Sequence, residues 1–254
     1  MRRVVTSVTS ILRCALLLAA LSGVAAAQDR SASPPLTVVE LFQSQGCSSC
    51  PPAQANLNAV AGLPNILALS YGVTYWDSLG WKDSFAKQAY TDRQYAYAHY
   101  RHRSDVFTPQ VYIDGQTDLV GSDAGQLQQA IVHAGVPAQA RARGPSLSWS
   151  QRSLRIGSGS RQALADVWLV RYDPRTLEVA ISAGENGGRT LPHRNVVREL
   201  LHLGVWHGGP QTFDFPAPAL AGLATAVLLQ EPSGGAILSA SKAPYEAGAA
   251  TALR

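Results

Sequence analysis

The sequence predicts an α/β domain over residues 36–135 and a β-rich, sandwich-like domain over residues 146–254. In the first segment, apolar runs of strand length alternate with stretches of helical periodicity. In the second, short β-prone runs are separated by glycine- and proline-containing turns. A linker rich in alanine, proline and arginine, residues 136–145, separates the two segments. The 254 residues, 46% hydrophobic and 15% charged, suffice for two such globular domains.

The N-terminus, residues 1–27, has the pattern of a secretory signal peptide. It contains three arginines and no acidic residue, an apolar run over residues 14–21, and three alanines before Gln28. The apolar run is too short to span a bilayer. We therefore expect cleavage between Ala27 and Gln28, no stable membrane span afterwards, and a periplasmic or secreted protein. An uncleaved membrane anchor is the alternative interpretation.

Loss of the signal would remove most of the positive charge. The 21 Lys and Arg less the three in residues 1–27 leave 18, against 17 Asp and Glu, so the formal charge falls from +4 to +1. A nearly neutral charge balance argues against nucleic-acid binding, which is typical of basic domains. We expect no nucleic-acid partner.

The first segment contains alternating strands and helices. A β-branched run over 36–42 predicts a buried strand, and residues 43–49 form a polar loop. Pro51 and Pro52 suit the first turn of a helix over 50–61, which Gly62 and Pro64 end. The further expected elements are a strand over 66–71, an aromatic irregular segment over 75–81, a helix over 84–102, strands over 110–113 and 117–120 about an Asp114-Gly115 turn, and a capped helix from Ser122 or Asp123 to about 134.

In the second segment, residues 146–254, the sequence predicts strands and no helix. The turn signals include Asp173-Pro174 and a glycine-rich stretch over 184–188, which precedes no helix and therefore indicates a β-turn rather than a phosphate-binding loop. The expected strands cover 146–156, 163–172, 176–182, 196–203, 225–230 and 236–240.

The cysteines point to one chemical site. Cys14 lies in the expected signal, so the mature chain keeps only Cys47 and Cys50, in one Cys-x-x-Cys motif. Export would place this pair in an oxidising compartment. A disulfide across so short a loop removes little entropy from the unfolded chain, which favours a redox or ligand-binding role over a bracing one.

The first segment resembles the thioredoxin superfamily. Cys47-Ser48-Ser49-Cys50 follows a predicted strand and opens a helix, and Thr108-Pro109 precedes a strand as the cis-proline loop of that superfamily does. The whole chain is also similar to a family of uncharacterised exported bacterial proteins, through residues 39–52 and 108–115. These likenesses imply a thioredoxin-like domain over 36–135.

The two cysteines would have different roles. Cys47, just before the helix, would be the nucleophile because the helix N-terminus stabilises a thiolate. Cys50, less exposed, would resolve the mixed disulfide. Ser48-Ser49 departs from the dipeptides of well-characterised relatives, so the sequence leaves the direction of electron flow open.

Four further residues complete the candidate site. Pro109, if cis, would expose backbone groups to an extended peptide, and a trans turn proline is the alternative. The resemblance to thioredoxins implies that Glu40 relays protons to Cys50, and an ordinary solvated acid is the alternative. Trp76 and Thr108 would contact the substrate, although aromatic residues in that region are equally compatible with a core.

These residues predict an exported thiol–disulfide oxidoreductase-like protein that acts on protein or small thiol and disulfide substrates. It would need no organic cofactor, and we expect no metal, since no second cysteine pair completes a zinc site. Two alternatives stay open. One is a non-catalytic binding or chaperone module with a permanent disulfide, and the other is a Cu(I) metallochaperone using both thiolates.

Overall fold

The computed structural model describes residues 35–141, 145–159 and 163–244, with side chains of 136–141 left aside. The expected signal peptide, residues 1–27, lies outside this range. Strands hold 40% of the residues and helices 18%. No helix within the described residues is long and apolar enough to cross a membrane.

Strand β1 (Thr37–Gln43) lies inside a large mixed sheet. It pairs parallel with β2 (Ile66–Gly72) and antiparallel with β3 (Gln110–Ile113), which carries β4 (Thr117–Leu119) on its other edge. Every residue of β1 and β2 is buried, as expected for apolar strands that are covered on both faces.

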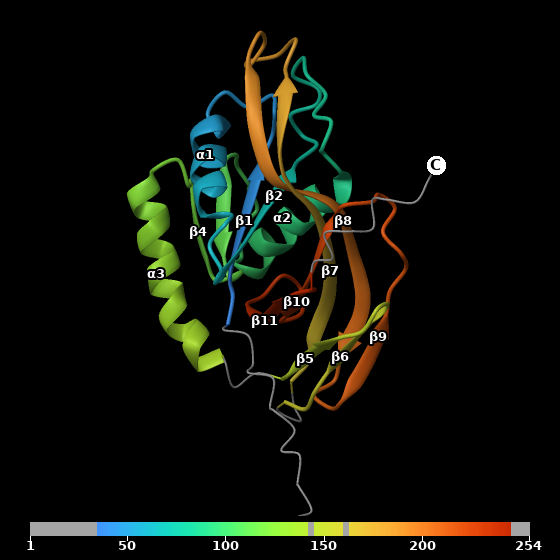
Figure 1. The fold of residues 1–254 in the computed structure, drawn as a ribbon. Helices are drawn as coiled ribbons and strands as arrows, with labels where there is room; N and C mark the ends of the chain where they lie inside the picture. The colour runs from blue at the N-terminus through green and yellow to red at the C-terminus, as the bar shows by residue number, and fades with distance from the viewer. Residues whose placement is uncertain (1–34, 142–144, 160–162, 245–254) are drawn as a thin grey trace, which may run out of the picture. The chain divides into compact units, whose positions relative to one another are not determined.

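The sheet continues beyond β2. Strand β8 (Thr190–Trp206) joins β2 in parallel at Ser70 and Val196, and it forms a long antiparallel hairpin with β7 (Ala165–Ala180). Strands β10 (Ala224–Gln230) and β11 (Ile237–Lys242) follow on the far edge. The order is β11-β10-β7-β8-β2-β1-β3-β4 (Figure 1).

The predicted fold class, a thioredoxin-like α/β domain followed by a β-sandwich domain, is therefore wrong. The described residues form a mostly β structure in which one eight-stranded mixed sheet takes strands from both halves of the sequence. The physical reason is that the β2 edge is open to hydrogen bonding, and β8 pairs with it. Asp173-Pro174 contributed to the error, because it does not end a strand but lies inside β7 at a shift of register.

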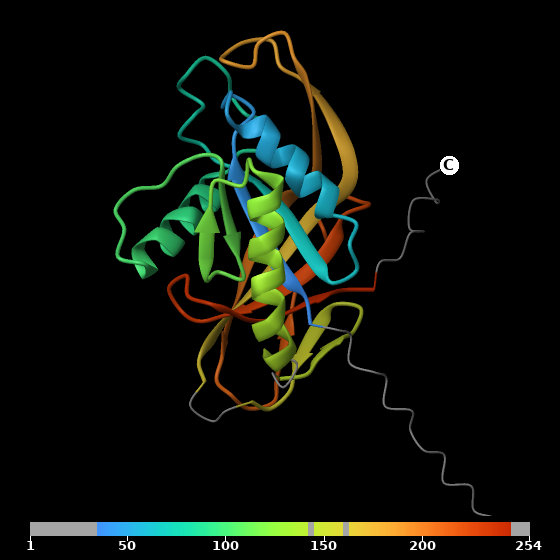
Figure 2. The same cartoon turned by 90° about the vertical axis from the view of Figure 1, so that its left-hand side faces the viewer.

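Three helices cover the part of the sheet around β1. Alternate residues of β1 face opposite ways. Val39 and Leu41 pack against α1 (Cys50–Val60) and α3 (Ala124–Arg141), whereas Val38 and Phe42 pack towards α2 (Gln88–Tyr100). The two sets of helices lie on opposite faces of these strands (Figure 2).

The core beneath α2 draws on both halves of the chain. Phe42, Tyr71 and Tyr97 form a cluster with Tyr172 and Ile237, among others. Strand β11 returns to the first half of the chain: the Ile237 N–H donates to the carbonyl of Asp114, the residue after β3, at 2.8 Å. Lys242 Nζ donates to the Ile66 carbonyl at 2.7 Å. The sheet therefore bends around this core.

A small second sheet packs against the open end of the β7–β8 hairpin, where β7 begins and β8 ends. It consists of β5 (Leu147–Trp149), β6 (Ser153–Ile156) and β9 (Gln211–Asp214), in that order. Its apolar residues pack with Val167, Trp206 and Val227 of the large sheet. The sequence did not predict β9, and it ended α3 near 134 where the helix continues to Arg141.

Candidate functional site

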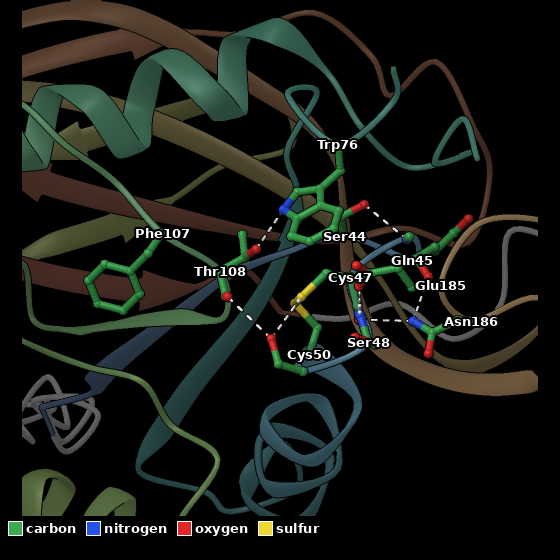
Figure 3. Close-up of a disulfide and its surroundings, with 12 residues drawn as sticks. Ser44, Gln45, Cys47, Ser48, Cys50, Trp76, Phe107, Thr108, Glu185 and Asn186 are labelled. Atoms are coloured by element: carbon green, nitrogen blue, oxygen red, sulfur yellow. Dashed lines mark hydrogen bonds between the residues drawn. A yellow bond between two sulfur atoms is a disulfide. The ribbon is translucent and has the colours of Figure 1, made fainter. Parts of the chain in front are cut away.

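The two cysteines lie where the motif places them, between the end of β1 and the start of α1. Cys47 and Cys50 form a disulfide with their Cα atoms 5.4 Å apart (Figure 3). Pro51 and Pro52 occupy the first helical turn, where their missing N–H groups cost no hydrogen bond. The predicted helix start at Cys50 is confirmed.

Both sulfur-bearing residues are buried. The exposed fraction is 0% for Cys47 and 1% for Cys50, while Ser48 and Ser49 between them are exposed. The expected difference in exposure between the two cysteines is thus absent. Because neither side chain meets solvent, a substrate reaches the disulfide only if a neighbouring segment moves.

One covering segment is the loop of residues 181–189 between β7 and β8, called here the hairpin tip. Asn186, 0% exposed, donates from Nδ2 to the Gln45 carbonyl at 2.9 Å and to the Cys47 carbonyl at 2.8 Å. Arg189 Nη1 donates to Asn186 Oδ1 at 2.6 Å and fixes the orientation of the amide. The hairpin tip is therefore hydrogen-bonded to residues 44–49 between β1 and α1, called here the cysteine loop.

Glu185 brings a negative charge to the start of α1. The Ser48 backbone N–H donates to Glu185 Oε2 at 2.9 Å. Hydrogen bonds from the Ser48 backbone and side chain hold the pKa of this carboxyl below its usual range. A carboxylate at this position competes with a Cys47 thiolate for the favourable potential of the helix N-terminus.

The hairpin tip needs glycine at its closest approach. Gly184 has φ +72°, and a Cβ placed there would lie 3.0 Å from Trp81 Cβ. The prediction of a turn over 184–188 between strands is confirmed. Its contact with the cysteine loop was not predicted, because no local pattern indicates a hydrogen bond across 139 residues.

On the other side of the disulfide lies the loop before β3. The Thr108–Pro109 peptide bond is cis. The Thr108 carbonyl accepts a hydrogen bond from Ser49 Oγ at 3.5 Å, and Ser49 Oγ lies 3.3 Å from Cys47 Sγ. Trp76 Nε1 donates to Thr108 Oγ1 at 2.7 Å (Figure 3). The structure thus brings Trp76, Thr108 and Pro109 to the cysteine motif.

Glu40 is not part of this group. Its carboxylate accepts from Arg93 Nε at 2.8 Å, from Arg93 Nη2 at 3.1 Å, and from the Tyr97 hydroxyl. These partners belong to α2, on the face of β1 opposite α1. The solvated alternative is wrong, because Glu40 is 0% exposed. Glu40 is a buried ion-pair residue whose carboxylate is held by side chains of α2.

Asp83 is hydrogen-bonded to the backbone of the cysteine loop. It is 3% exposed, and its carboxylate accepts from the Gln45 N–H at 2.8 Å and the Phe85 N–H at 2.7 Å. Burial raises the pKa of Asp83 to about 6, although these backbone hydrogen bonds lower it. Trp81 Nε1 donates to Gln45 Oε1 at 2.9 Å, so Gln45 is held through both backbone and side chain.

In the described part of the chain, no three His, Cys, Asp or Glu side chains gather in a way that could hold a metal ion. The structure has a buried Cys47–Cys50 disulfide between the hairpin tip and the loop that contains the cis-proline. The fold and site thus define a protein with one disulfide at a helix start, set on a large mixed sheet.

The chain belongs to the family described as protein of unknown function (DUF1223), which matches over residues 38–230. A solved protein from Agrobacterium tumefaciens, a structural genomics target, is 32% identical, with a TM-score of 0.67 over 86% of this chain and 96% of that one. HBP35 of Porphyromonas gingivalis is 12% identical, with a TM-score of 0.59 over 87% of this chain and 79% of that one, and shows a similar fold alone. No curated protein matches the sequence.

Proposed function

We propose that this protein is an exported thiol–disulfide oxidoreductase whose redox centre is the Cys47–Cys50 pair. The observation that carries the proposal is the position of the disulfide at the start of α1, beside the cis Thr108–Pro109 peptide. A thiolate at Cys47 would lie at the positive end of the helix dipole, where it is stabilised. Thr108 and Trp76 would contact the substrate from the loop side.

The exchange balances without an organic cofactor. When the pair acts as a reductant, the Cys47 thiolate attacks one sulfur of a substrate disulfide, the other substrate sulfur leaves as a thiolate, and a mixed disulfide forms. The Cys50 thiolate then attacks Cys47 Sγ, releases the second substrate thiolate and restores the Cys47–Cys50 bond. Two electrons pass to the substrate, and the reverse sequence oxidises a substrate dithiol.

Burial of both cysteines favours a second candidate, a binding module with a permanent disulfide. A glutathione redox titration of the Cys47–Cys50 pair, combined with an insulin-reduction assay, separates the two. An oxidoreductase shows a titratable couple and turnover, and Cys50→Ser traps mixed disulfides whereas Cys47→Ser does not. A pair that stays oxidised throughout, without turnover, indicates the binding module.

The titration also separates the metallochaperone. One Cu(I) bound per reduced protein, without exchange activity, would indicate that alternative. The Cys47→Ser/Cys50→Ser double variant is the control for each assay. Export is tested separately by fractionation of cells that make the full chain and by N-terminal sequencing, which should find a mature protein that begins at Gln28.

A further inference from the structure

A cavity of about 210 Å³ lies between α1 and the first residues of β8. Helix α1 contributes Cys50, Gln54 and Ala55 to its lining, and β8 contributes Leu191 and His193. The remaining lining residues are Gln43, Ser44, Pro51 and Pro192. The cavity therefore adjoins the residue that carries one sulfur of the disulfide.

Most polar groups of the lining already have partners. Gln54 Oε1 accepts from Ser70 Oγ at 2.7 Å, and Gln54 Nε2 donates to Asn58 Oδ1 at 2.7 Å. Ser44 Oγ accepts from the Gly46 N–H at 3.1 Å. These side chains are committed to the protein itself, so they offer little to a ligand.

His193 is different. It is 1% exposed, and neither Nδ1 nor Nε2 has a hydrogen-bond partner among the described residues. The ring is oriented by Phe85, which meets it edge-on with centroids 5.7 Å apart. Burial lowers the pKa of His193 to about 4, so the imidazole is neutral at pH 7. A buried neutral imidazole with an unused donor and an unused acceptor calls for a partner, since unmade hydrogen bonds are costly inside a protein.

The rest of the lining restricts the ligand. None of the lining residues is Lys, Arg, Asp or Glu, so the cavity offers no countercharge to an ionic ligand. Pro51, Ala55, Leu191 and Pro192 supply apolar contacts. The volume lies below the range of pockets for drug-sized molecules. A hydroxyl group suits His193 in either tautomer because it both donates and accepts.

We propose that this cavity binds a small, mainly apolar molecule with one hydroxyl group, of the phenol class, whose hydroxyl is hydrogen-bonded to the His193 ring. The apolar body lies between Ala55 of α1 and Leu191 of β8. This site goes beyond the redox function proposed above, since binding involves the oxidised protein and needs no electron transfer. A failure of thiol exchange would leave it untouched.

The test is a titration of the oxidised full chain with phenol, followed by calorimetry and by the nitrogen resonances of the His193 ring. We expect one saturable site and a shift of those resonances at saturation. Toluene, which matches the apolar body but lacks the hydroxyl, should bind at least about ten-fold more weakly. Equal binding of phenol and toluene would overturn the role of His193.

Two exposed alanines of α1 provide a matched pair of variants. Ala55 lines the cavity, whereas Ala59, one turn further along the helix, does not. Ala55→Trp should obstruct the cavity and reduce phenol affinity by at least about ten-fold, while Ala59→Trp should leave it unchanged. Both positions are exposed, so both variants should fold, which a thermal melt confirms. Equal affinity of the two variants, or His193 resonances that stay unchanged at phenol saturation because water alone occupies the cavity, would overturn the proposal.

Discussion

The side-chain amide of Asn186 donates a hydrogen bond to the backbone carbonyl of Cys47 at 2.8 Å, across 139 residues of sequence. The same amide donates to the Gln45 carbonyl, so one buried side chain holds the segment that carries the first cysteine. Access to the disulfide and the stability of the β7–β8 hairpin are therefore coupled. This coupling leads to the first prediction.

Asn186→Ala removes both hydrogen bonds and leaves two buried carbonyls without this donor. We expect the free energy of unfolding to fall by about 1–3 kcal/mol. We also expect dithiothreitol to reduce the disulfide faster, because the hairpin tip is released. Urea unfolding and stopped thiol labelling measure the two effects. Ser182→Ala, an exposed change in the same tip, is the control, and equal reduction rates in the two variants would contradict the coupling.

Glu185→Gln keeps the shape of the side chain but removes its charge beside Ser48. The pKa of the Cys47 thiol should fall, since a nearby carboxylate disfavours a thiolate. The pH dependence of iodoacetamide labelling in a Cys50→Ser background measures it. The disulfide should also become easier to reduce, because a more stable thiolate favours the reduced form. A thiol pKa that is unchanged or higher would count against this electrostatic role.

His193 should make stability fall in mild acid. Burial lowers the pKa of His193 from 6.5 to about 4. Between pH 6.5 and pH 4, this histidine is therefore protonated in the unfolded chain but neutral in the native protein. The free energy of unfolding should therefore drop by up to about 1.4 kcal/mol per pH unit as the pH falls from 6.5 to 4, and then level off.

The acid effect of His193 needs a difference measurement, because Asp83 acts in the opposite direction. Its pKa is raised to about 6, so the native protein binds that proton more readily than the unfolded chain, and stability from this group is lost as pH rises through 6. Comparing wild type with His193→Phe keeps Asp83 constant. Denaturant midpoints with the same pH profile in both proteins would refute the assignment.

Glu40→Gln breaks the buried ion pair with Arg93 without changing side-chain size. We expect a loss of about 3–5 kcal/mol in the free energy of unfolding, because the Arg93 charge stays buried without its partner. The rate at which a mixed disulfide on Cys47 is resolved should stay the same, since the carboxylate faces α2. Slower resolution by about ten-fold or more would instead support a proton relay to Cys50.

Two glycines of the hairpin tip separate backbone strain from close packing. Gly184 and Gly188 both have positive φ, +72° and +81°, but only Gly184 has a neighbour within 4 Å of an added Cβ. Gly188→Ala should cost about 1 kcal/mol of unfolding free energy, the usual penalty of this conformation. Gly184→Ala should cost more, because Trp81 must also shift. Thermal melts of both variants provide the comparison, and equal midpoints would show that the contact is unimportant.

Local chemistry predicted the elements around the cysteines well. The run over 36–42 and the prolines after Cys50 placed β1 and α1 within one residue of their observed bounds, because those signals act over a few neighbouring residues. Asp173-Pro174 is a local turn signal that the fold overrides, because pairing with β8 at Asp173–Val196 and Thr176–Arg194 carries β7 through it. The fold class failed where pairing is non-local, as between Ser70 and Val196.

The candidate site was predictable to the same extent. Thr108 and Pro109 carry a recognisable dipeptide before a strand, so their place beside the motif followed from the sequence. Glu185 and Asn186 belong to a glycine-rich turn that has no chemical signature of its own. Their relation to Cys47 depends on how far the β7–β8 hairpin extends, which only the assembled sheet determines.

The contact between β11 and the first residue of β2 affects how the chain must fold. The Lys242–Ile66 hydrogen bond joins residues 176 apart, and the core around Phe42 includes Ile237 from the last strand. A ribosome must therefore have made the chain as far as Ile237 before that core can close. Contacts of such high sequence separation slow the search for the native state, so we expect folding on a timescale of milliseconds to seconds or longer. Strand β11 is thus part of that core rather than an appendage to it.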